Sequence, residues 1–132
     1  MEKIILDTDI FIDYFRGVSE AESYIENLPI DKRGTTDVTL MELFSGARDK
    51  KNLATIVEFI ETNSFFVFPV TASASKNATE LVKKYTLSRG LRMPDALVAA
   101  IALSVGGTLV TGNKRHFEFI DALKVEIPPY RN

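Results

Sequence analysis

The chain has 132 residues, of which 45% are hydrophobic and 26% charged, and its formal net charge is −2. We expect a single domain over residues 1–132, since this length suits one compact core. The absence of cysteine excludes disulfides, thiolate metal sites and cysteine nucleophiles. The slightly negative net charge argues against a surface that is positive all over and binds nucleic acids nonspecifically. No apolar run approaches the ~20 residues of a membrane span, so we expect a cytoplasmic protein without membrane contact.

Short apolar runs and residues spaced three or four apart predict strands alternating with helices. In the first half we expect a buried strand at residues 3–6 ended by Asp7, a helix at 10–15 stopped by Gly17, a helix at 21–28 ended by Pro29, a strand through Val38, a helix from Thr39 to Gly46, and a helix over 53–60. In the second half we expect a strand at 65–70, a helix over 74–85 ended by Gly90, a buried helix from Pro94, a strand at 108–111, and an edge strand at 123–127. This order predicts an α/β fold of three layers, with a mostly parallel sheet and helices on both faces.

Four polar residues from separate segments are expected at one edge of this sheet. Asp7 ends the first strand, and Glu42 lies in the first turn of the helix after the second strand. Asp95 lies in the first turn of a helix that leads back into a strand, and Asn113 follows that strand by two residues. The carboxyl ends of parallel strands carry the ligand site in such folds, so these residues are candidates for one site.

Each acid also has a purely structural alternative. Asp7 or Asp9 would cap the first helix. Thr39 and Glu42 match the S/T-x-x-E capping box, and Asp95 would complement the positive end of a helix dipole. Caps contribute only ~0.5 to 2 kcal/mol apiece, whereas like charges ~4 Å apart repel by ~4 kcal/mol at an effective dielectric near 20. A divalent cation removes such repulsion, and Mg²⁺ and Mn²⁺ favour carboxylate and water oxygens, so the set favours a metal site.

Three segments resemble the motifs of a known family. In order, and over almost the whole chain, IILDTDIFIDYF, TDVTLMELFSGA and GLRMPDALVAAIALSVGGTLVTGNKRHF are similar to the motifs of the PIN domain, specifically of VapC toxins from type II toxin-antitoxin pairs. The resemblance implies a PIN-like parallel sheet of four to five strands flanked by helices. It also implies an RNA-cleaving enzyme that depends on Mg²⁺ or Mn²⁺, commonly a homodimer, and neutralised by a small antitoxin protein that inserts a segment into the active site. Matched motif by motif, it implies that Asp7, Glu42 and Asp95 are the catalytic metal ligands.

The segment after the fourth predicted strand departs from the family pattern. Family members often carry an aspartate there, whereas this chain has Asn113 and His116. Asn113 can orient a water or coordinate weakly through its carbonyl, but it brings no charge, which argues against a second metal ion. Thr8 and Asp9 beside the first acid, and Thr111 at the end of the fourth strand, are expected to support the ligands or to bind weakly.

Two further groups complete the candidate site. Asp13 is expected on a solvated helix face or paired with a basic group. Basic residues around the site would bring RNA phosphates to an acidic pocket, or would serve only as solvated charge at the ends of helices and strands; they are Arg89, Arg92, Lys114, Arg115 and His116. One metal ion held by the three acids would polarise the phosphoryl group and lower the pKa of the attacking water.

The sequence leaves two other functions open. DTD also resembles the opening motif of haloacid-dehalogenase phosphatases, with Asp7 as nucleophile and Asp9 as acid, but TGNKRHF lacks the paired acids which that family carries after its fourth strand. A catalytically degenerate PIN-like module that binds RNA or a partner protein is the second alternative, because the fourth acid is missing. Metal-dependent cleavage of RNA would separate these functions.

Overall fold

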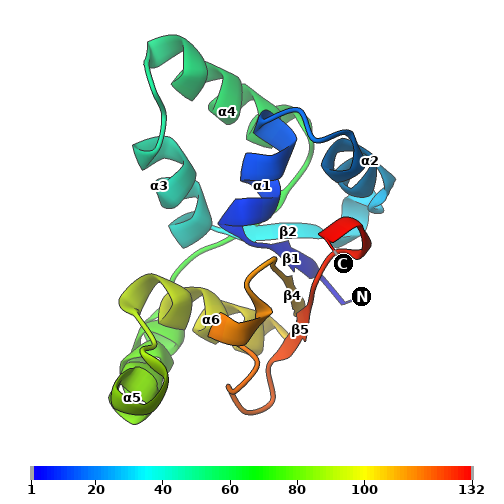
Figure 1. Ribbon diagram of the computed structural model, residues 1–132. Coiled ribbons are helices and arrows are strands. Elements are labelled where there is room, and N and C mark those ends of the chain that lie inside the picture. Colours follow the sequence, from blue (N-terminus) through cyan, green and yellow to red (C-terminus); the bar gives the residue numbers. More distant parts are fainter. Residues whose placement is uncertain (1, 132) are drawn as a thin grey trace.

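A parallel sheet forms the centre of the computed structural model, which describes residues 2–131 (Figure 1). Its strands are β1 (Ile4–Leu6), β2 (Arg33–Thr36), β3 (Phe66–Phe68), β4 (Thr108–Val110) and β5 (Lys124–Glu126). They lie in the order β3-β2-β1-β4-β5, and each neighbouring pair is parallel. The chain moves outward from β1 to β3 and then returns to the other side of β1, so the strand order reverses between β1 and β4. Ligand sites of open α/β sheets lie at such a reversal, beyond the carboxyl ends of the strands.

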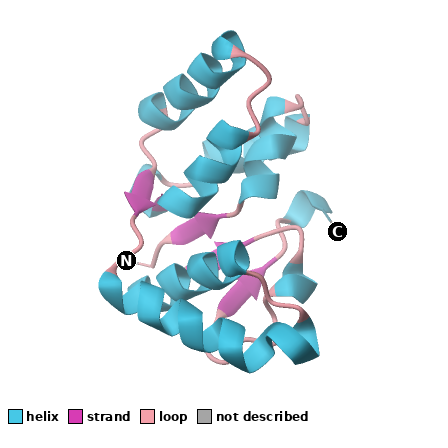
Figure 2. Ribbon diagram, turned by 90° about the vertical axis from the view of Figure 1, so that its left-hand side faces the viewer, coloured by secondary structure: helices cyan, strands magenta, loops and turns pink. Residues whose placement is uncertain are grey.

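Helices cover both faces of the sheet, which confirms the predicted three-layer α/β fold. They are α1 (Thr8–Phe15), α2 (Ser19–Asn27), α3 (Asp37–Ser45), α4 (Lys50–Thr62), α5 (Ala72–Arg89) and α6 (Met93–Val105), with short 3-10 turns η1 (Ile30–Lys32), η2 (Lys114–His116) and η3 (Pro129–Arg131). Figures 1 and 2 show α5 and α6 together on one side of the sheet and α1 to α4 on the other. No helix within residues 2–131 combines the length and the apolarity that crossing a membrane requires.

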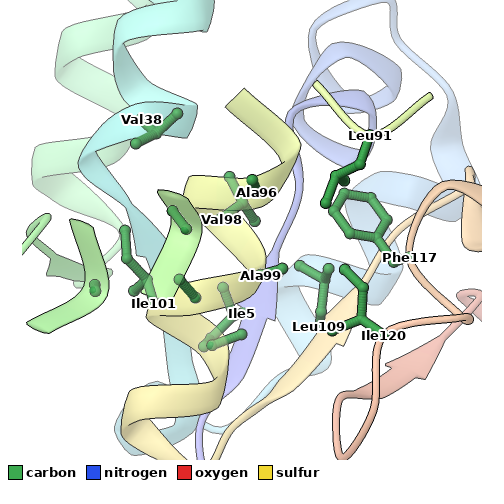
Figure 3. Close-up of a cluster of buried hydrophobic side chains, with 14 residues drawn as sticks. Ile5, Val38, Leu91, Ala96, Val98, Ala99, Ile101, Leu109, Phe117 and Ile120 are labelled. Atoms are coloured by element: carbon green, nitrogen blue, oxygen red, sulfur yellow. The ribbon is translucent and has the colours of Figure 1, made fainter. Parts of the chain in front are cut away.

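Alternating side chains of the central strands divide the interior into two cores. Ile5 of β1 and Leu109 of β4 are buried against α5 and α6 (Figure 3), whereas the next residues along each strand, Leu6 and Val110, are buried on the opposite side. This follows from the two-residue period of a strand. As predicted, α6 is buried on most of its surface, through Ala96, Val98, Ala99, Ala100, Ile101 and Ala102. The two cores hold β1 and β4 rigidly side by side at the centre of the sheet.

The predicted boundary between the second strand and its helix is wrong by two residues. The strand ends at Thr36 rather than Val38, and α3 begins at Asp37 rather than Thr39. The reason is that Oγ1 of Thr36 accepts a hydrogen bond from the backbone N–H of Thr39 (3.0 Å), so Thr36 is the N-cap. The predicted capping box of Thr39 and Glu42 is therefore wrong, and Glu42 lies in the second turn of α3 instead of the first.

The first helix begins earlier than its apolar residues indicate. Oδ1 of Asp7 accepts a hydrogen bond from the backbone N–H of Thr8 (2.8 Å), which makes Asp7 the N-cap of α1. Asp9 lies inside the first turn of α1 and does not cap it. Asp7 thus combines the end of a strand, the start of a helix and a place in the candidate site.

Candidate metal centre

Four acidic side chains from β1, α1, α3 and α6 gather beyond the carboxyl ends of the central strands. Asp7 directly follows β1, Asp9 lies in the first turn of α1, and Asp95 lies in the first turn of α6. Their charges influence one another, because Asp9 and Asp95 both raise the pKa of Asp7, and Glu42 raises the pKa of Asp95. The structure therefore brings together the acids that the sequence places at this edge.

Asp7 is the most buried of these acids, with 8% of the residue exposed. Its Oδ1 accepts the Thr8 N–H, and its Oδ2 accepts a hydrogen bond from Oγ1 of Thr111 (2.8 Å). Burial, and then the negative charges of Asp9 and Asp95, raise the pKa of Asp7 from 3.8 to about 7, although the two hydrogen bonds lower it. At neutral pH this carboxyl is poised between its two protonation states, and a bound cation would favour the charged one.

Glu42 and Asp95 come from two different helices, α3 and α6. Oε1 of Glu42 accepts a hydrogen bond from Oγ1 of Thr8 (2.8 Å), which links α3 to the start of α1. Burial raises the pKa of Asp95, and Glu42 raises it further, while His116 and Arg92 lower it. Nδ1 of His116 lies 3.7 Å from Oδ2 of Asp95, so the imidazole borders the site without replacing a carboxylate.

Asp9 holds the turn that follows β4. Its Oδ2 accepts hydrogen bonds from the backbone N–H of Gly112 (2.7 Å) and from Nδ2 of Asn113 (3.5 Å). Nη1 of Arg131 lies 3.6 Å from the same oxygen. Burial raises the pKa of Asp9, against the effects of Gly112 and Arg131, and its Oδ1 is buried without a hydrogen-bond partner among the described residues. Asn113, at the position where the family often has an acid, thus donates to Asp9.

Asp13 is paired with basic and hydroxyl groups rather than solvated, which is one of the two arrangements expected. Arg131 donates to Asp13 from Nε (2.8 Å) and from Nη2 (3.0 Å), and the Tyr130 hydroxyl donates to the same carboxylate (2.8 Å). These contacts join positions 117 and 118 residues apart. Sequence reasoning missed Tyr130 and Arg131, because no local pattern signals a contact over that separation.

The donor set suits a divalent cation that prefers oxygen ligands. Carboxylate oxygens are available from Asp7, Glu42 and Asp95. A bound cation would relieve the repulsion between these carboxylates. Within residues 2–131, the acidic and histidine side chains form no group of three that is arranged to hold a metal ion.

The five basic residues singled out in the sequence lie in different surroundings. Arg92 is the residue before α6, and Arg115 and His116 are exposed in η2. The Arg89 guanidinium lies 5.4 Å from the centre of the Phe119 ring. Lys114 is half-buried and lines a cavity with Tyr24, Val125, Glu126, Ile127 and Pro129. Their contact with RNA stays a prediction.

Comparison with known proteins decides the family. The sequence matches the PIN domain over residues 4–123, which includes every acid described above. This chain belongs to the PIN domain family. The phosphatase alternative is set aside, because the match is to a different family and because Asp9, its required acid, is bound to Gly112 and Arg131.

Relatives of this PIN domain include named nucleases. It is 30% identical over 129 residues to "Ribonuclease VapC19" of Mycobacterium tuberculosis, covering 96% of this chain and 98% of that protein. It is also 30% identical over 132 residues to the "tRNA(fMet)-specific endonuclease VapC" of Shigella flexneri, with the same coverage. Among solved structures, it is similar to DNA-bound VapBC from Salmonella typhimurium, with a TM-score of 0.80, 27% identity, and coverage of 96% of this chain and 98% of that one. Fold and sequence therefore agree on the same family.

Proposed function

We propose that this PIN domain is a metal-dependent ribonuclease that hydrolyses RNA phosphodiester bonds and is the toxin of a VapBC-type toxin-antitoxin pair. The observation that carries the proposal is the gathering of Asp7, Glu42 and Asp95 at the carboxyl edge of a PIN fold. The relatives named as VapC ribonucleases support the reaction type. We propose that the protein acts on RNA in the cytoplasm.

In the proposed mechanism, Asp7, Glu42 and Asp95 would hold Mg²⁺ or Mn²⁺. A bound divalent cation would polarise the phosphoryl group of the substrate and lower the pKa of the attacking water. Thr111 and the Thr8 N–H each donate to one oxygen of Asp7, and thereby orient its carboxylate. Thr8 also donates to Glu42, so one residue links two of the proposed ligands.

The basic residues at the rim are proposed to bind the RNA backbone. Exposed cations near an acidic metal site offset its repulsion of phosphates and position the substrate. Arg92 and His116 both lower the pKa of Asp95, so both lie close enough to affect this acid. This role predicts that binding weakens steeply as the salt concentration rises.

A small antitoxin protein is the proposed partner, since the similar solved structure is of a VapBC complex. A cavity of about 340 Å³ beside Glu42 offers apolar surface to an inserted segment, and is lined by Ile12, Phe15, Arg16, Glu42, Leu43, Gly46, Arg48, Asn52 and Ile56.

We also propose a homodimer. An apolar groove of about 690 Å³ between α5 and the start of α6 includes Val82, Met93 and Leu97, and 68% of Met93 is exposed. Covering this groove with a second copy would bury apolar surface that water now contacts.

Cleavage of a structured RNA, such as a transfer RNA transcript, tests the proposed reaction. We expect cleavage with Mg²⁺ or Mn²⁺, none with EDTA, and a loss of at least ~100-fold in Asp7→Asn and Asp95→Asn. Asp121→Asn, at an exposed position in the turn before β5, is the matched control and should cleave like the wild type. Unchanged cleavage by the two site variants would overturn the proposed centre. RNA that binds to the wild type but stays intact with either metal would favour the degenerate binding module.

A further inference from the structure

The last described residues of the chain lie against the first helix. Arg131, in η3, spans Asp9 and Asp13, which are one helical turn apart on α1. The guanidinium donates two hydrogen bonds to Asp13, and the Tyr130 hydroxyl donates a third. We call this arrangement of Asp9, Asp13, Tyr130 and Arg131 the C-terminal clasp. Only one third of the Arg131 side chain is exposed, which limits the competition from water for these contacts.

The C-terminal clasp also touches the turn after β4. A Cβ atom added to Gly112 would overlap Nη1 of Arg131 and Oδ2 of Asp9. Gly112 does not have a positive φ, so a larger residue here would be opposed by these two side-chain ends, which would have to shift and give up their present contacts. The turn of Thr111, Gly112 and Asn113 is thus packed directly against the clasp.

From this turn the contacts continue to Asp7. Asp9 fixes the backbone N–H of Gly112. One position earlier, the Thr111 hydroxyl accepts the N–H of Asn113 (3.0 Å), which leaves its own proton to be donated to Oδ2 of Asp7. The place of the turn therefore determines where the Thr111 hydroxyl meets the carboxylate.

We propose that Tyr130 and Arg131 are positioning residues of the metal centre, which hold Asp9 as the anchor of the Thr111–Gly112–Asn113 turn and so orient Asp7. The inference rests on the proposed function in taking Asp7 as a metal ligand. It assigns Asp9 to support of the turn rather than to metal binding, because Oδ2 of Asp9 is already shared between Gly112, Asn113 and Arg131.

The direction in which the metal affinity changes when Arg131 is removed distinguishes a positioning role from a purely electrostatic one. A guanidinium near the acids repels a divalent cation, so its charge alone would make metal binding tighter once Arg131 is removed. A positioning role predicts the reverse, since groups that orient metal ligands typically contribute 10- to 100-fold in metal affinity. Arg131→Met removes both the charge and the hydrogen bonds, and Arg131→Lys keeps the charge but loses the two-pronged contact with Asp13.

The first measurement uses the metal-free protein. Amide hydrogen exchange by NMR should be at least ~10-fold faster at Gly112 in Arg131→Met, with Leu109 in β4 unchanged and Arg131→Lys in between. Lys76→Met, which removes an exposed cation on α5, is the matched control and should leave the exchange rate of Gly112 unchanged. Unchanged exchange at Gly112 in Arg131→Met would overturn the inference.

The second measurement is the dissociation constant for Mn²⁺ by calorimetry. We expect it to rise by ~10-fold or more in Arg131→Met and by less in Tyr130→Phe. Tighter Mn²⁺ binding in Arg131→Met would overturn the inference, as would a lower melting temperature with unchanged Mn²⁺ affinity. Failure of the proposed function gives a different result, because the wild type then binds no Mn²⁺. In that case the exchange rate of Gly112 alone tests whether the C-terminal clasp holds the turn.

Discussion

Thr111 and Asp7, 104 positions apart in the chain, are joined by a hydrogen bond of 2.8 Å between two buried side chains. This bond connects the ends of β1 and β4, the two strands between which the strand order reverses. Through this bond the second half of the chain contacts the carboxylate of the proposed metal ligand in the first half.

Replacing Thr111 by valine should weaken metal binding. The variant keeps the shape of the side chain but leaves Oδ2 of Asp7 without its donor, so we expect the dissociation constant for Mn²⁺ to rise by ~10-fold. Thr111→Ser retains the hydroxyl and should bind like the wild type. Calorimetric titration of both variants checks this, and equal Mn²⁺ affinities for Thr111→Val and Thr111→Ser would show that the hydrogen bond does not orient a ligand.

The metal-free protein should become less stable as the pH rises through neutrality. Folding raises the pKa of Asp7 from 3.8 to about 7, so its contribution to stability is fully present below pH ~4 and is lost as the pH rises through 7. The loss amounts to as much as ~4 kcal/mol in the free energy of unfolding. The raised pKa values of Asp9 and Asp95 act in the same direction, whereas the lowered pKa of Asp13 gives stability that is lost only as the pH falls.

Urea unfolding in EDTA between pH 4 and 8 measures this dependence. Asp7→Asn removes the titrating carboxyl and should flatten the profile, so that the variant is more stable than the wild type at pH 8. Parallel profiles for the two proteins would contradict the raised pKa of Asp7.

Divalent cations should stabilise the folded protein. At a free Mn²⁺ concentration a hundredfold above its dissociation constant, we expect the free energy of unfolding to rise by ~2.7 kcal/mol, because the ion binds only where folding gathers the acids. Thermal melts with and without Mn²⁺ measure the effect, with Asp121→Asn as the variant that should respond fully and Asp7→Asn as the one that should not. A melting temperature that does not change at millimolar Mn²⁺ would count against the metal centre.

Loss of the apolar groove should separate the proposed homodimer. Met93→Asp places a charge in the groove between α5 and α6, and the desolvation of that charge would oppose association. Size-exclusion chromatography with light scattering should give a dimer for the wild type and a monomer for this variant. Leu53→Asp, on the outer surface of α4 where the side chain is also exposed, is the control and should remain dimeric. A monomeric wild type would refute the proposed homodimer.

The fold could be predicted from local patterns, because each element carries its own signal. The apolar run before Asp7, the glycine-terminated helix ending at Gly90 and the alanine-rich helix after Pro94 all appear where expected. The predicted start of α3 was wrong because Thr36 and Thr39, three positions apart, both suit an N-cap. Thr36 has the extended backbone that capping needs. The ligand roles of Asp7, Glu42 and Asp95, and the single domain, stay predictions.

Local patterns were enough to predict that strands alternate with helices and that Asp7, Glu42, Asp95 and Asn113 lie near strand ends or helix starts, since these features depend on residues close together in the chain. The roles of Asp9 and Asp13 depend on the folded structure, because their partners Gly112, Tyr130 and Arg131 lie more than 100 positions away in the chain. A pairing over that distance depends on how the sheet closes and where the chain end comes to rest, and no local periodicity encodes it. The two acids of the DTD motif, equivalent in the sequence, thereby acquire different surroundings: Asp7 is buried under Thr111, and Asp9 is held by the C-terminal clasp.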